Sequence, residues 1–214
     1  MQTQTKATGT TPALLACGVV SGPLFVAVAL LQVLTRDGFD LSRHPLSLLS
    51  LGDLGWVQIA NFVVTGLLAL AFAVGARRVL QPGRAATWGP RLLGLYGIGL
   101  VAGGVFVADP GAGFPPGAPA GAPEQLSWHG ALHAVAPPLA FLSLILACLV
   151  VARRFAAAGE RGWAAYSVAS ALGCLALTAW PDLDGISVRL AVAMVVGPAW
   201  VSASAAKWLQ RPQP

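Results

Sequence analysis

Residues 127–152 read SWHGALHAVAPPLAFLSLILACLVVA, and this long apolar stretch decides the fold class. A helix needs about 20 mostly apolar residues to cross a bilayer, and this stretch carries no Asp, Glu, Lys or Arg. Five further stretches of similar character accompany it. The six predicted spans lie near residues 12–35, 55–77, 88–108, 127–152, 163–181 and 186–208. We therefore predict an all-α fold, a bundle of six transmembrane helices over residues 12–208, with short tails at 1–11 and 209–214.

The composition of the chain agrees with a membrane protein. Of its 214 residues, 56% are hydrophobic and 10% are charged, whereas soluble domains carry about 25% charged residues. The net charge of +5 does not indicate a nucleic-acid partner, because the basic residues form no stripe interleaved with aromatics. All three cysteines lie inside apolar stretches, so no disulfide framework is expected. The expected partner is the lipid bilayer.

The basic residues predict the orientation in the membrane. Ten of the thirteen lie in the tails or in the segments that follow the second and fourth spans, and only Arg36, Arg43 and Arg189 lie on the opposite side. Since Lys and Arg are enriched in cytoplasmic loops, we expect both tails to be cytoplasmic in a multi-pass protein of the plasma (inner) membrane. All acids except Glu160, and all three histidines, then lie on the outer side.

Two segments on that outer side differ in character. Residues 36–54 are too polar to span the membrane and too apolar for a free coil, which favours an interfacial or re-entrant cap over the bundle. Residues 109–126 are rich in Pro and Gly, which predicts a connector without regular structure.

The candidate chemistry begins with His129 and His133. They stand four residues apart, so they share one helix face at a separation of about 6 Å. Two histidines at this spacing suit a zinc ion, with His44, Asp53 or Asp109 as a third ligand and water in the fourth position. Alternatively, the pair acts in metal-free acid–base or ligand-binding chemistry, or hydrogen-bonds at the headgroup level with no further role.

The two acids have structural alternatives as well. Asp109 ends the third predicted span in an Asp-Pro pair, where it terminates the helix or faces a pocket. Asp53 precedes the second span, where it is an N-cap or a second pocket residue. Ser47 and Ser50 flank His44 and Asp53 in sequence, but closeness along the chain does not make a catalytic triad.

These landmarks resemble an uncharacterised bacterial membrane family, the domain of unknown function 998 family. The resemblance covers roughly residues 15–180, and it implies six spans with a shared polar site. The positions that match the family pattern are Asp53, Leu54, Gly55, Asn61, Phe106, Asp109 and His133. Gly52 stands where the family usually has Ser, which weakens a serine-nucleophile hypothesis, and Val107 stands where Pro is usual.

We therefore expect an outward-facing polar pocket formed by Asp53, Asp109, His129 and His133, because ionisable residues at a membrane boundary are functional candidates. Two classes of function remain open. One is a membrane-embedded enzyme that acts on a lipid-type substrate at the outer leaflet, either a metal-dependent hydrolase or an enzyme in which the histidines act as acid and base without a metal. The other is a non-enzymatic protein of binding, transport or assembly, with a lipid or small-molecule ligand.

Overall fold

The computed structural model describes residues 9–83, 85–182 and 184–210. Six α-helices and one short 3-10 helix (η1) make up its regular structure, in agreement with the predicted all-α bundle. Their bounds are α1 (Thr10–Thr35), η1 (Leu46–Ser50), α2 (Gly55–Leu80), α3 (Trp88–Val105), α4 (Trp128–Ala157), α5 (Arg161–Ala179) and α6 (Ile186–Leu209).

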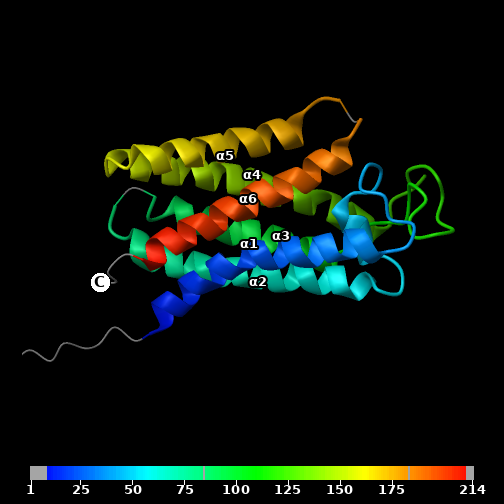
Figure 1. Cartoon of the computed structure of the whole chain (residues 1–214), viewed down its shortest axis with the longest axis horizontal. Helices are drawn as coiled ribbons and strands as arrows, with labels where there is room; N and C mark the ends of the chain where they lie inside the picture. Colours follow the sequence, from blue (N-terminus) through cyan, green and yellow to red (C-terminus); the bar gives the residue numbers. More distant parts are fainter. Residues whose placement is uncertain (1–8, 84, 183, 211–214) are drawn as a thin grey trace, which may run out of the picture.

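The helices form a closed ring in chain order. Each α-helix packs against the next one in the sequence, and α6 returns to pack against α1. Because consecutive helices run up and down, the described chain begins and ends at the same end of the bundle, which we call the terminal end (Figure 1). The opposite end, which we call the loop end, carries residues 36–54, 106–127, 180–182 and 184–185.

Five of the helices are long and apolar enough to cross a membrane, and α3 is the exception. It has 18 residues, or about 27 Å of helix at 1.5 Å per residue, which is close to the hydrocarbon thickness of about 30 Å. The predicted third span ran to residue 108, but the helix ends at Val105 and Phe106 is extended. The chain thus leaves α3 one turn earlier than the apolar run suggested.

Small residues allow α3 to approach its neighbours closely. A Cβ placed on Gly97 would lie 2.8 Å from the carbonyl oxygen of Gly66 on α2, and one placed on Gly66 would lie 2.7 Å from that of Gly97. Close contact of this kind is a common way to hold helices together in lipid. The largest wholly buried side chains, Trp200, Trp208 and Tyr96 among them, fill the interior.

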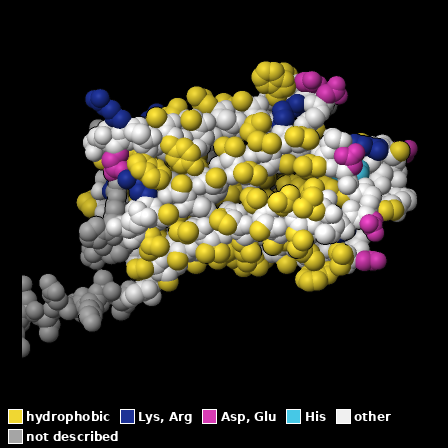
Figure 2. Space-filling view, viewed as in Figure 1, with side chains coloured by type: hydrophobic (Ala, Val, Ile, Leu, Met, Phe, Trp, Pro, Cys, Tyr) yellow, Lys and Arg dark blue, Asp and Glu magenta, His cyan; other side chains and the backbone are white. Residues whose placement is uncertain are grey.

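The surface of the bundle matches a membrane environment. Hydrophobic side chains cover its middle, and charged side chains gather at the two ends (Figure 2). Exposed tryptophans lie near both ends, with Trp56, Trp128 and Trp180 at the loop end and Trp88 at the terminal end. Tryptophan is enriched at both membrane–water interfaces. The helices and this surface describe a multi-pass membrane protein.

At the loop end, residues 36–54 and residues 109–126 fold onto each other. Leu49 of η1 and Phe114 of the Pro/Gly-rich connector are both fully buried. Arg36 donates hydrogen bonds to the carbonyls of Leu49 and Leu51, and its guanidinium lies 5.5 Å from the Phe114 ring centre. The connector has no helix, as expected, yet Phe114 anchors it, which its composition did not predict.

Candidate functional site

His133 is the histidine that the helices bring into the interior. It lies on the second turn of α4 and is 7% exposed. Its Nδ1 lies 2.7 Å from the carbonyl oxygen of Phe106. A carbonyl can only accept, so Nδ1 is the donor in this hydrogen bond. Within the described part of the chain, Nε2 has no hydrogen-bond partner.

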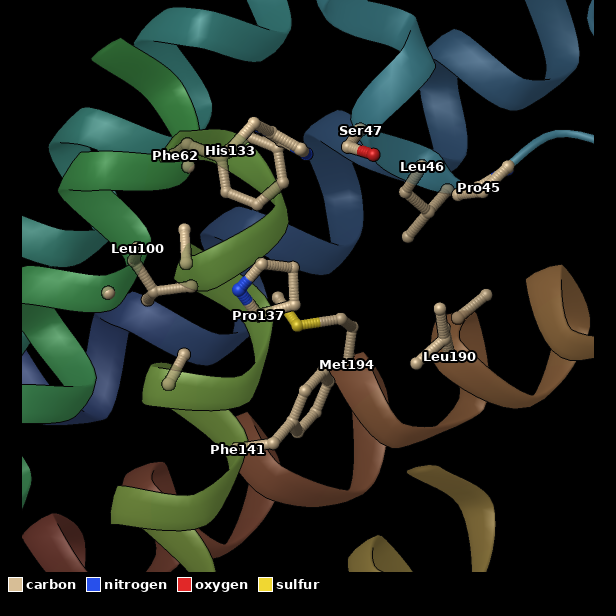
Figure 3. A pocket seen from close by; sticks show the side chains of 15 residues that line it. Pro45, Leu46, Ser47, Phe62, Leu100, His133, Pro137, Phe141, Leu190 and Met194 are labelled. Atoms are coloured by element: carbon tan, nitrogen blue, oxygen red, sulfur yellow. The ribbon is translucent and has the colours of Figure 1, made fainter. Parts of the chain in front are cut away.

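This histidine lines an apolar cavity of about 70 Å³ between α2, α3, α4, α6 and η1. Leu46 and Ser47 of η1 close it toward the loop end, and Leu190 and Met194 of α6 lie opposite (Figure 3). In this view His133 and Ser47 lie toward one end of the cavity, away from Phe141. The remaining lining is apolar: Pro45, Phe62, Gly99, Leu100, Gly103, Ala136, Pro137, Ala140 and Ala191.

Asp109 lies beside the first turn of α4, but its carboxylate is held by Ser127. Oδ2 accepts from the Ser127 N–H at 2.8 Å, and the Ser127 hydroxyl in turn accepts from the Gly130 N–H at 3.0 Å. Hydrogen bonds from the Ser127 hydroxyl and N–H hold the pKa of Asp109 below its ordinary value, and the nearby His129 and His133 act in the same direction. Asp109 therefore stabilises the start of α4, whereas the predicted structural alternative had it end α3.

His129 is placed differently from His133. It is half-buried, its ring lies against those of Trp128 and Phe106, and it does not line the cavity. Both α4 histidines thus lie near Asp109, but only the deeper one faces the interior.

His44, one of the three candidates for the third zinc ligand, has a hydrogen-bond partner at each ring nitrogen. Nδ1 accepts from the Asp40 N–H at 2.9 Å, and Nε2 lies 2.9 Å from the Ala112 carbonyl, to which it donates. His44 thereby joins the two loop-end segments. Among the described residues no group of three His, Cys, Asp or Glu side chains is placed to hold a metal ion, so the structure does not assemble the proposed zinc site.

Asp53 also lies outside the cavity. It is exposed, and its carboxylate lies close enough to the Arg36 guanidinium to stabilise that positive charge. The N-cap of α2 is Leu54, with no capping side-chain hydrogen bond, so the N-cap expected of Asp53 is wrong. The predicted four-residue pocket separates into Asp109 with the two α4 histidines, and Asp53 with Arg36.

Ser47 is a cavity residue that sequence reasoning placed elsewhere. Its neighbours in the sequence are His44 and Asp53, whereas in the fold it lines the same cavity as His133. No local pattern signals this, because the two residues are 86 positions apart and meet only when η1 folds over α4. No hydrogen bond joins Ser47 to His133 in the described structure.

Comparison with known proteins gives one family match. The sequence model of a family described as "Protein of unknown function (DUF998)" matches residues 19–207, which is most of the chain. No curated protein and no solved structure matches it significantly.

Proposed function

This chain belongs to the DUF998 family, and we propose that it binds a lipid-type ligand from the membrane in the cavity beside His133. The observation that carries this proposal is an apolar cavity lined by one histidine whose Nε2 has no hydrogen-bond partner in the described structure. The lining accommodates hydrocarbon, and Nε2 accepts a hydrogen bond from a hydroxyl or amide of the ligand.

The size of the cavity argues for partial insertion. Sites that enclose a whole drug-sized molecule measure about 300–1,000 Å³, and this cavity measures about 70 Å³. It has room for one short part of a ligand. The remainder of a lipid would stay in the bilayer, which is why we favour a lipid over a soluble small molecule.

We propose that this site lies at the outer leaflet, and the charge distribution supports this orientation. Of the described basic residues, those at the terminal end outnumber the three at the loop end, and the acids show the reverse pattern (Figure 2). The positive-inside rule then directs the terminal end to the cytoplasm. A ligand would enter the cavity near the outer membrane surface.

Binding is better supported than catalysis. A serine hydrolase needs the serine hydroxyl hydrogen-bonded to the histidine and a third group that orients the ring. Here the third group is the Phe106 carbonyl, Asp109 is bonded to Ser127, and Ser47 donates no bond to His133 in the described structure. The ring is oriented, but no nucleophile is prepared.

Photolabelling tests the proposal. The protein is reconstituted in phosphatidylcholine vesicles with a diazirine-bearing monoacylglycerol, a single-chain lipid with hydroxyl donors, and labelled peptides are mapped by mass spectrometry. Labelling at Leu190 and Met194 should be competed by unlabelled monoacylglycerol. Labelling at Leu172, which is 57% exposed on α5, should not be competed, because bulk lipid contacts it without saturation.

His133→Gln is the diagnostic variant, and His129→Gln is its matched control one turn away. A lost hydrogen bond of about 0.5–1.5 kcal/mol corresponds to a loss of competition affinity of roughly 2- to 12-fold. His129→Gln should bind like the wild type. Equal affinity of wild type and His133→Gln would refute the proposed contact, and release of glycerol from the probe would instead support an esterase.

A further inference from the structure

Three amide side chains meet inside the bundle between α1 and α2, apart from the His133 cavity. Gln32 on α1 is 4% exposed, and Gln58 and Asn61 on α2 are 0% and 4% exposed. The Gln58 Oε1 accepts from Gln32 Nε2 at 2.7 Å and from Asn61 Nδ2 at 3.2 Å. One oxygen therefore joins all three side chains.

Backbone carbonyls settle which end of each amide is nitrogen. Gln32 Nε2 also donates to the Val28 carbonyl at 3.2 Å, and Asn61 Nδ2 donates to the Phe25 carbonyl at 3.1 Å. A carbonyl accepts only, so neither amide can be turned round. The two donors that converge on Gln58 then require its oxygen at that position.

Four buried polar atoms of this group have no partner in the described structure. They are Gln32 Oε1, Gln58 Nε2, Asn61 Oδ1 and Thr65 Oγ1. Thr65 is 1% exposed. Several other hydroxyls in the spans bond to their own helix, as Thr178 Oγ1 does to the Cys174 carbonyl at 2.8 Å. The hydroxyl of Thr65 makes no such bond, although burying an unpaired polar group is costly.

The group extends from the loop end toward the middle of the bundle. Gln58, Asn61 and Thr65 are three and four residues apart, so they follow one face of α2. Thr65 lies ten residues beyond the start of α2, which is about 15 Å along the helix and half of a hydrocarbon layer of about 30 Å. Further along α2, the fully buried Phe72 makes the interior apolar again.

We infer that these residues form a buried water site that reaches from the loop end to the middle of the membrane. Buried waters typically make about three hydrogen bonds to groups that lack other partners. The open atoms are two acceptors, one donor and a hydroxyl, and water both donates and accepts. A bare cation would satisfy the two oxygens and leave the Gln58 amide unpaired, so the chemistry favours water over sodium.

The sequence supplies a single-site probe, because Asn61 is the one asparagine of the chain. In phosphatidylcholine bilayers, a sample labelled with ¹⁵N-asparagine assigns the side-chain amide signal of Asn61 by solid-state NMR, and a uniformly ¹⁵N-labelled sample adds the backbone amides for comparison. Magnetisation transferred from water should reach this signal as quickly as it reaches backbone amides of residues 109–126. Transfer no faster than to lipid-facing amides of α5 would overturn the water site.

Two threonine variants and one salt comparison complete the test. Thr65→Val removes a hydroxyl without a partner and should slow the transfer of magnetisation to Asn61. Thr178→Val removes a hydroxyl that is bonded to a carbonyl of its own helix, and it should leave the transfer unchanged. Equal effects of the two variants would contradict the assignment. Equal thermal stability in sodium chloride and choline chloride at the same ionic strength supports water, and stabilisation by sodium alone would replace the water site with a cation site.

Discussion

Two glycines on the face of α3 that packs against α4 should respond differently to alanine. A Cβ on Gly99 would lie 2.8 Å from both the Cβ and the backbone nitrogen of Ala140. A Cβ on Gly103, one turn further, would lie 3.8 Å from the Cβ of Ala136. Ordinary contact distances are 3.4–4 Å, so only Gly99→Ala forces the two helices apart, by about 0.6–1.2 Å. A gap of that size forfeits roughly a quarter to a half of the affected packing energy.

The size of the effect is best expressed as the difference in the free energy of unfolding between the two variants. Each gains about 1 kcal/mol of helix propensity, and this term cancels when they are compared. Overpacking costs about 1–3 kcal/mol and applies to Gly99→Ala alone. We therefore expect Gly99→Ala to be less stable than Gly103→Ala by about 1–3 kcal/mol, with Gly103→Ala as stable as the wild type or more so.

Reversible unfolding by sodium dodecyl sulfate in mixed micelles would measure this difference, with the buried Trp200 and Trp208 as fluorescent reporters. Equal stabilities, or a less stable Gly103→Ala, would refute the packing of α3 on α4. Gly103 also lines the His133 cavity. Its alanine variant should therefore weaken competed photolabelling without loss of stability, which separates ligand binding from folding.

Three further predictions concern the ends of the bundle. Reporter fusions after Gly159 and Gln210 should indicate the cytoplasm and fusions at Gly117 and Gly185 the outside; a cytoplasmic signal at Gly117 would reverse the orientation and the proposed leaflet. Protease added from outside should cut residues 113–121 faster than residues 42–50, because Leu48 and Leu49 are buried; equal rates would show that the first segment is not a cap. The pKa of Asp109 is lowered in the folded protein, so its contribution to stability is complete above the unfolded value of about 4 and is lost as the pH falls through the lower folded value. The melting-temperature difference between wild type and Asp109→Asn should thus be constant near neutral pH and shrink in acid, and a difference that grows in acid would contradict the Ser127 hydrogen bonds.

Local composition was enough to predict the six helices and their approximate bounds. The length and apolarity of each stretch are set by the thickness of the bilayer, so the six helices lie close to the predicted spans. Local signals were least informative where chain direction changes. The Phe106 carbonyl is left exposed to His133 because α3 ends early, and hydropathy does not register a break of one turn.

The contacts of the polar residues depend on the tertiary structure. Ser47 and His133 line one cavity, His44 contacts Ala112, and Gln32 contacts Gln58. Each of these contacts brings together positions that are far apart in the sequence. The sequence shows that amide side chains lie inside the apolar spans, but it does not show which residues they contact. Hydrogen bonds depend on distances of about 3 Å, and such distances between distant residues are settled only when the helices pack.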